Sequence, residues 1–222
     1  MKEYIKSIMI ILTGFGLGAC EFDNEPEPGI TFEGNFVYNG QPVPMMNGRA
    51  RLSFYEDAFE LNGRFTVHSN QDGRFSELVF PGNYDVVLDF DRGAYEDNSD
   101  TTSINITGNT FFEWDVVPFY FVNEANYNIN GNTLSATVDV SQISTRDLEF
   151  VSLLISRLKI CDRVNHEDEI QIPAAEITDL SNISIAADLT DWPQDYCFVR
   201  VGVKSDGNTY YNYSQVTKID LN

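Results

Sequence analysis

The stretch DGRFSELVFPGNYDVVLDF, residues 72–90, contains two candidate strands and the turns that precede them. Arg74–Phe80 and Tyr84–Phe90 are short runs rich in apolar, β-branched and aromatic residues, which is typical of β-strands. Asp72-Gly73 favours the primed turn of a hairpin, and Pro81-Gly82 favours a type II turn with glycine at positive φ. The stretch therefore predicts antiparallel β-structure.

The same pattern continues on both sides of residues 72–90. Short apolar or alternating runs recur, separated by turns such as Asn39-Gly40, Asn62-Gly63 and Gly108-Asn109. Further strands are expected at Thr31–Tyr38, Ala50–Tyr55, Arg64–His68, Thr102–Ile106, Phe111–Val117, Thr133–Val140, Val151–Ile160, Ile170–Pro173, Ile183–Ala187, Tyr196–Lys204 and Tyr210–Ile219. Asp147–Arg163 also has the apolar spacing of a helical stripe, so both strand and helix stay open there.

A domain boundary is expected near Pro118, which follows the strand at Phe111–Val117. Residues 29–118 and 119–222 would each form a β-sandwich, because about seven strands in roughly a hundred residues is the usual count for that fold. The predicted fold class is all-β, with two consecutive antiparallel β-sandwich domains.

Residues 1–19 have the composition of an export signal. Lysines precede the apolar run Ile8–Leu12, and small residues follow it. The run is too short to span a bilayer, which takes about 20 apolar residues. Leu17-Gly18-Ala19-Cys20 resembles the bacterial lipobox, and this resemblance implies cleavage before Cys20 and lipidation of that cysteine. Attachment to a membrane through lipid on Cys20 is therefore expected.

Residues 20–28, CEFDNEPEP, are acidic and rich in proline, which is typical of a flexible tether. They resemble the acidic signal by which Bacteroidetes send lipoproteins to the outer face of the outer membrane, which implies a cell-surface location. The formal charge of −20 becomes −21 when the net +1 of Lys2, Lys6 and Glu3 is removed with the signal. Nucleic acid is not expected as a partner, because phosphate binding depends on clustered Lys and Arg.

Motifs in each predicted domain resemble known sandwich families. Gly40-Gln-Pro42, Asp72-Gly-Arg-Phe75 and Phe80-Pro-Gly-Asn-Tyr84 are similar to turns of the transthyretin-like, or carboxypeptidase regulatory-like, sandwich. Trp192–Tyr196 and the following Cys197–Val203 resemble the tyrosine corner and F strand of immunoglobulin and fibronectin type III domains. The second resemblance implies that Tyr196 bonds to upstream backbone, and that the core is faced by Val199, Val201 and Val203.

The order of lipobox, acidic tether and two sandwiches resembles a Bacteroidetes lipoprotein family of unknown function. Its members tend to be encoded beside glycan importers of the SusC and SusD type. The resemblance implies a non-enzymatic surface protein that assists glycan capture or uptake by a polysaccharide-utilisation system. Two alternatives stay open: a structural subunit that pairs with a SusD-like partner, and a calcium-dependent adhesion module.

No catalytic constellation is evident, and neither an enzyme nor a cofactor is expected. The histidines, His68 and His166, lie in a predicted strand and in a charged loop, where solvent exposure is the usual outcome. Calcium, which takes carboxylate oxygens, could bind an acidic loop, with a solvated loop as the alternative. The candidate ligands are Asp89, Asp91, Glu96, Asp97 and Asp100.

Aromatic residues make up 13% of the chain, and sugar faces stack well on exposed rings. Trp192, Tyr210 and Tyr95 are the candidates for a glycan-binding platform, with core or interface packing as the alternative. Apart from Cys20, the cysteines are Cys161 and Cys197. A disulfide between them and two buried free thiols are both open, since the compartment beyond the inner membrane is oxidising.

Overall fold

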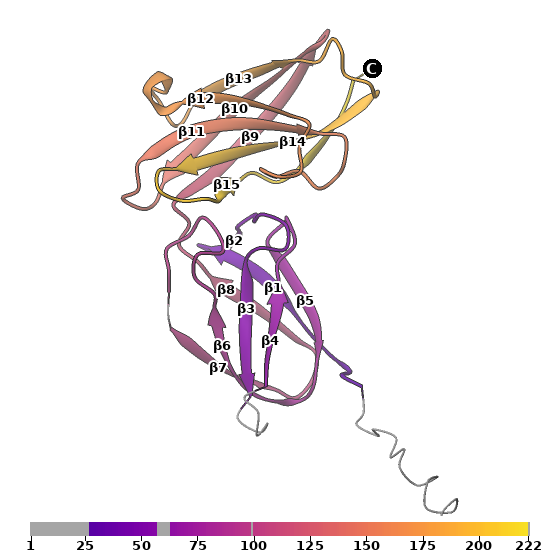
Figure 1. The fold of residues 1–222 in the computed structure, drawn as a ribbon, viewed down its shortest axis with the longest axis vertical. Coiled ribbons are helices and arrows are strands. Elements are labelled where there is room, and N and C mark those ends of the chain that lie inside the picture. The colour runs from indigo at the N-terminus through magenta and orange to yellow at the C-terminus, as the bar shows by residue number, and fades with distance from the viewer. Residues whose placement is uncertain (1–26, 57–62, 99, 222) are drawn as a thin grey trace, which may run out of the picture.

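The computed structural model describes residues 27–56, 63–98 and 100–221. These residues form two β domains joined end to end, so the expected all-β class with two sandwich domains is confirmed (Figure 1). Among them, no helix has the length and apolar character needed to cross a membrane. The predicted signal at 1–19, Cys20 and most of the acidic tether lie outside the described residues.

The N-terminal domain packs two sheets around one apolar core. The first sheet is centred on β1 (Ile30–Tyr38), whose partners are β2 (Gln41–Pro42), β5 (Arg74–Val79) and β8 (Thr110–Asp115). The second has the order β4 (Arg64–His68), β3 (Arg51–Glu56), β6 (Gly82–Leu88) and β7 (Thr101–Ile106). Phe32 of the first sheet and Phe54 of the second are fully buried and meet edge to face with ring centroids 5.1 Å apart.

One strand pair in this domain departs from the antiparallel expectation. β8 runs parallel to β1, with Phe32 opposite Thr110 and Val37 opposite Asp115. The two strands approach closely at Gly34, where an added Cβ would overlap the Phe112 carbonyl and meet the Phe75 ring at 2.7 Å. Glycine is therefore required at position 34 for β8 to lie beside β1.

The C-terminal domain also packs two sheets. One has the order β13 (Ile183–Asp188), β10 (Thr133–Gln142) and β9 (Tyr120–Asn130). The other has the order β12 (Asp168–Pro173), β11 (Leu148–Ser156), β14 (Tyr196–Ser205) and β15 (Tyr211–Tyr213), with β16 (Thr217–Asp220) paired to the start of β14. A 3₁₀ turn, η1 (Ala174–Glu176), follows β12. Val199, Val201 and Val203 are fully buried, as expected.

The structure settles the alternative left open for Asp147–Arg163 and adds one strand that was not predicted. Asp147–Arg163 contains the strand β11 and no helix, because its backbone pairs with β12 on one side and β14 on the other. β9 was not predicted, although its half-buried side alternates Ala125, Tyr127 and Ile129 with exposed positions. Asparagine occupies the intervening positions, and this residue type is more typical of turns than of strands.

The turn predictions met different outcomes. Asn39 and Gly40 both have positive φ, at 52° and 73°, as a primed hairpin turn requires. In the Asp72-Gly73 turn only Gly73 has positive φ, because the β4–β5 connection is longer and the Asn70 side chain accepts hydrogen bonds from the main-chain N–H of Asp72 and Arg74. The prediction of a type II turn at Pro81-Gly82 is wrong, because Gly82 is the first residue of β6 and does not have positive φ.

The two domains are held together around Arg200, which lies on β14 and is fully buried. Its guanidinium donates to the carbonyl oxygens of Gln71 at 2.6 Å and Met45 at 3.0 Å, both in the N-terminal domain. It also donates to the carbonyls of Cys161 and Ser214, and it lies 4.1 Å from the Tyr213 ring centroid. Arginine is not deprotonated in proteins, so a positive charge is buried at the junction.

Amide side chains complete this junction. Gln71 donates from Nε2 to the Lys159 carbonyl and accepts from the Cys161 N–H through Oε1. Asn212 donates from Nδ2 to the Ala94 carbonyl at 2.7 Å, so β15 is bonded to the loop that follows β6. These hydrogen bonds satisfy backbone groups that docking of the domains removes from water.

Candidate functional site

A groove of about 510 Å³ opens at the end of the β3–β4–β6 sheet, where the loop after β6 meets the turn before β15. Charged and aromatic side chains line it. We call it the Phe90 groove and define it by Arg51, Tyr55, Arg64, Asp89, Phe90, Asp91, Arg92 and Tyr210. All but Tyr210 belong to the N-terminal domain, so the groove takes one wall from each domain.

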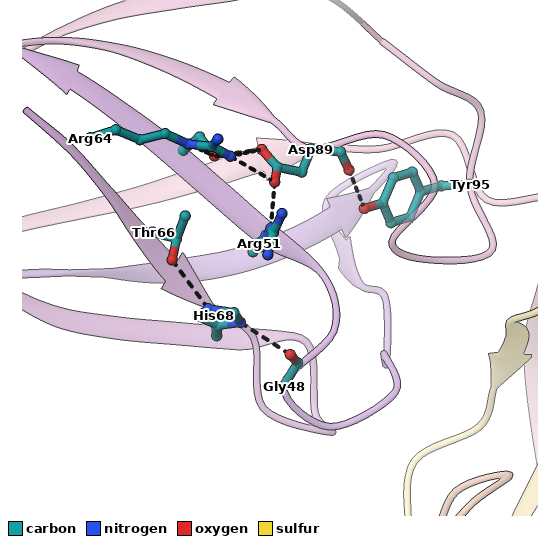
Figure 2. A network of polar contacts seen from close by, with 8 residues as sticks. Gly48, Arg51, Arg64, Thr66, His68, Asp89 and Tyr95 are labelled. Carbon is teal, nitrogen blue, oxygen red and sulfur yellow. Dashed lines mark hydrogen bonds and ion pairs between the residues drawn. The ribbon is translucent and has the colours of Figure 1, made fainter. Parts of the chain in front are cut away.

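Asp89 is the centre of a charge network in this groove (Figure 2). It directly follows β6, and its carboxylate faces Arg51 and Ser53 of β3 and Arg64 of β4. The Arg51 Nε contacts Asp89 Oδ2, and the Arg64 Nη2 lies 3.2 Å from the same oxygen. Arg64 also donates to the Ser53 hydroxyl at 2.7 Å. Three neighbouring strands thereby fix two guanidinium groups on one side of the groove.

The network also fixes the charge of Asp89. Burial alone would raise the pKa of this carboxyl, but hydrogen bonds from Ser53 and Arg51 and the charges of Arg51 and Arg64 outweigh burial and lower the pKa. Asp89 is thus a carboxylate at neutral pH. It can accept hydrogen bonds and cannot donate one.

The aromatic wall is formed by rings from different elements. Phe90 is 69% exposed and Tyr55 is 40% exposed, while Tyr210 is half-buried. The Arg64 guanidinium carbon lies 5.7 Å from the Tyr55 ring centroid, which is within the range of a cation–π contact. A ring as exposed as Phe90 gains nothing from the core, and it offers a free face to a ligand.

The loop that carries Phe90 is held in one shape by its own contacts. Asp91 has φ +53°, an uncommon backbone conformation for a residue other than glycine, and its N–H donates to Asp97 Oδ1 at 3.2 Å. The Tyr95 hydroxyl donates to the Asp89 carbonyl at 3.1 Å (Figure 2). Strained residues of this kind tend to occur at functional sites, where surrounding contacts maintain them.

Of the three aromatic residues predicted to bind glycan, only Tyr210 lies at this groove. Tyr95 is wrong as an exposed platform, because it is 2% exposed and supports the loop from beneath. Trp192 is half-buried against the core of the C-terminal domain, and its indole N–H donates to the Tyr196 carbonyl at 2.9 Å. The hydrogen bond at this corner therefore comes from Trp192. In the described residues the Tyr196 hydroxyl makes none, and Lys218 lies over its ring instead.

The predicted calcium site is also wrong for the described part of the chain, in which no group of three or more acidic, histidine or cysteine side chains could hold a metal ion. Asp89 is paired with two arginines, and Asp97 accepts the Asp91 N–H. The candidate ligands Asp91, Glu96 and Asp100 are exposed on the same loop. Their charges are solvated or neutralised locally rather than converging on one point.

Cys161 and Cys197 are both buried free thiols, so the disulfide alternative is not realised in the structure. Cys161 lies at the domain junction, whereas Cys197 faces the core of the C-terminal sandwich from β14. Burial raises the pKa of Cys161 to about 12 and that of Cys197 to about 11. Neither thiol is ionised at neutral pH, and the thiolate is the reactive form.

Among the described residues neither histidine bonds to the groove's charge network, although His68 lies opposite Arg51 in the β3–β4 register. His68 is exposed on β4, where Nε2 lies 3.2 Å from the Thr66 hydroxyl and Nδ1 lies 3.0 Å from the Gly48 carbonyl (Figure 2). His166 is half-buried in the C-terminal domain, with Nδ1 3.0 Å from the Asp162 carbonyl. The two rings belong to different domains, and each is bonded to local backbone.

Sequence reasoning missed Arg51, Tyr55, Arg64, Phe90 and Arg92 as site residues. Their signal was weak, because each is an ordinary outward position of a strand or a residue of a loop. Phe90 had the clearest sequence signal of the five, because it is a large apolar residue between two aspartates at the end of a predicted strand.

Family models match nearly all of the described chain. Residues 30–117 match the "Protein of unknown function (DUF3823) N-terminal domain", and residues 120–218 match the "Domain of unknown function (DUF3823_C)". No curated protein matches the sequence.

Solved structures share the fold over the whole of this region. A DUF3823 family protein from Bacteroides ovatus superposes with a TM-score of 0.81 at 27% identity, covering 87% of this chain and 100% of the other. A DUF3823 family protein from Parabacteroides merdae gives 0.78 at 23% identity, covering 86% and 98%. A Bacteroides uniformis protein named "putative carbohydrate binding protein" gives 0.72 at 17% identity, covering 87% and 100%. The two domain matches together span most of the sequence, and the chain belongs to the DUF3823 family.

Proposed function

We propose that this protein is a non-enzymatic carbohydrate-binding protein and that the Phe90 groove is its binding site. The observation that carries the proposal is the exposed Phe90 ring on a fixed loop beside a fixed charge network. Aromatic rings stack on the apolar faces of sugars, and oriented charged groups bond their hydroxyls. The name of the Bacteroides uniformis relative points to the same ligand class.

The groove suits a sugar because its polar groups are already oriented. Asp89 and Ser53 hold Arg51 and Arg64 in place, so these side chains lose little freedom when a ligand arrives. A smaller entropic cost leaves more of the contact energy as affinity. Phe90 and Tyr55 supply the apolar faces, and Tyr210 closes the groove from the other domain.

Affinity electrophoresis against neutral and acidic polysaccharides tests this function. We expect at least one polymer to retard the protein, and we expect Phe90→Ala to weaken that binding about tenfold or more, which corresponds to about 1.4 kcal/mol. Phe111→Ala is the matched control, because Phe111 is 60% exposed on β8 in the other sheet. Absence of retardation by every polymer, or an equal loss in both variants, would contradict the proposal.

The place of action is part of the same proposal. Lipid on Cys20 would anchor the protein at the outer face of the outer membrane, with residues 21–28 as the tether, and a SusC- and SusD-like complex would be its partner. The first domain would be of the transthyretin-like type and the second of the fibronectin III-like type. The resemblances in the sequence support these assignments. Mass spectrometry of residue 20 in protein from its native host, together with co-purification from solubilised outer membranes, tests the anchor and the partner.

A further inference from the structure

We infer that the Phe90 groove selects a sugar acid, with arginine side chains binding the sugar carboxylate. The inference deepens the proposed function and rests on it. It concerns the class of glycan, whereas the proposed function requires only that some glycan binds.

The groove is locally positive in a strongly acidic chain. Three arginines, Arg51, Arg64 and Arg92, line it together with two aspartates, Asp89 and Asp91, which leaves a formal balance of 3 − 2 = +1. The whole chain has only 14 basic residues against 34 acidic ones and a net charge of −20. A concentration of arginine at one groove therefore runs against the composition of the chain.

The hydrogen-bonding groups of the groove are mainly donors. Arg51 donates to Asp89 through Nε. Arg64 donates to the Ser53 hydroxyl through Nε and Nη2, and to Asp89 through Nη2. In the part of the chain that the structure describes, the Nη groups of Arg51 and the Nη1 of Arg64 bond no acceptor, and no carboxylate pairs with Arg92. All three arginines line a groove in which the Asp89 carboxylate is already paired.

An excess of donors favours a ligand with an excess of acceptors. A hydroxyl of a neutral sugar donates as well as accepts, whereas a carboxylate only accepts and matches the planar fork of a guanidinium. Charge-assisted hydrogen bonds of this kind are about twice as strong as neutral ones. The arginines therefore distinguish an acidic sugar from its neutral counterpart.

The negative charge of the chain does not prevent this selection. At physiological ionic strength the screening length is about 8 Å, so carboxylates elsewhere on the surface act weakly on a ligand in the groove. The groups within the groove dominate the local field. Arg64 and Arg51 are 44% and 26% exposed, so their charges are accessible to a ligand.

The test compares acidic polysaccharides with their carboxyl-reduced forms, which differ only where a carboxylate becomes a hydroxymethyl group. The full chain is run in affinity electrophoresis against polygalacturonate, alginate, hyaluronan and the reduced form of each, beside neutral glucans and mannans. We expect an acidic polymer to bind, its reduced form to bind about tenfold more weakly, and Arg92→Gln to lose about tenfold toward the acidic polymer. Arg74→Gln, an exposed arginine on β5, is the control and should bind as the native chain does.

The outcomes separate the two proposals. Binding to neutral polymers with no preference for a carboxylate overturns the sugar-acid inference and leaves the proposed function standing. Equal binding by the acidic and reduced forms, or an unchanged Arg92→Gln variant with the melting temperature of the native chain, also overturns the inference. Absence of binding to any polymer overturns the proposed function itself.

Discussion

The Arg200 guanidinium in the C-terminal domain donates a hydrogen bond of 2.6 Å to the main-chain carbonyl of Gln71 in the N-terminal domain. The Gln71 side chain also crosses between the domains: it donates to the Lys159 carbonyl and accepts from the Cys161 N–H. The orientation of the two domains is therefore set by groups buried between them. The same junction places Tyr210 against the N-terminal wall of the Phe90 groove.

Replacement of this arginine should destabilise the whole chain. Arg200→Met leaves the buried carbonyls of Met45, Cys161 and Ser214 without their donor, and we expect a loss of about 3–5 kcal/mol in the free energy of unfolding. Urea denaturation measures it. Arg157→Met is the control, since Arg157 pairs with Glu167 at a half-exposed site, where a pair contributes about 0–1 kcal/mol. Similar losses in both variants would contradict the buried role of Arg200.

A methyl group at Gly34 should disrupt the parallel pairing of β1 and β8. Gly34→Ala places a Cβ on the Phe112 carbonyl, and we expect a loss of about 1–3 kcal/mol or more in unfolding free energy, because two packed strands must separate. Gly108→Ala is the control and should leave the stability nearly unchanged, because nothing lies within 4 Å of an added Cβ at that position. Thermal denaturation compares the two variants, and equal melting temperatures would show that β8 does not lie against β1.

The stabilising effect of Asp89 should depend on pH. Its pKa is lower in the folded chain than in the unfolded chain, so its contribution is present above the unfolded value of about 4 and is lost as the pH falls through the folded value. We expect Asp89→Asn to cost about 1–3 kcal/mol at pH 7 and less at pH 3. Urea titrations at both pH values measure the difference.

The exposed Asp115 on β8 supplies the control for that experiment. Asp115→Asn should leave the unfolding free energy within about 0.5 kcal/mol of the native value at either pH. A cost of Asp89→Asn that stays constant from pH 7 to pH 3 would show that the ionised carboxylate is not what stabilises the network.

The two buried thiols should be unreactive in the folded protein. Burial raises the pKa of Cys161 to about 12, so the thiolate fraction at pH 8 is very small. We expect iodoacetamide to leave Cys161 and Cys197 unmodified in native buffer and to alkylate both in urea without a reductant. Peptide mass spectrometry reads each site, and recovery of a disulfide-linked peptide from unreduced protein would contradict the free thiols.

The strands were predictable where period-two alternation coincided with strand-forming residue types. Arg64–His68 was predicted with its observed bounds, since Phe65 and Val67 alternate with polar positions. β9 was missed because asparagine interrupts an alternation that is otherwise present. The parallel partner of β1 could not be predicted either, because β8 lies about 80 residues later and local patterns carry no information on pairing at that distance.

The site was less predictable than the fold. Tyr210 was expected to be accessible, and it lines the groove, but its partners come from β3, β4 and the loop after β6. Tyr95 and Phe90 lie five residues apart in the same loop, and no sequence pattern distinguishes the buried ring from the exposed one. The hydroxyl of the buried Tyr95 ring bonds the Asp89 carbonyl, and Asn212 and Asn208 bond the neighbouring Ala94 and Gly93 carbonyls from the other domain, contacts between residues that lie far apart in the sequence.

The arrangement around Arg200 also has a consequence for docking of the domains. The core of the N-terminal sandwich is built without residue 200, so before docking the Met45 carbonyl bonds to water, and the Gln71 carbonyl bonds to water as well as to the Met45 N–H. Docking must expel that water and bury a cation in its place. An undocked N-terminal domain consequently presents a hydrated, acceptor-rich end until β14 covers it.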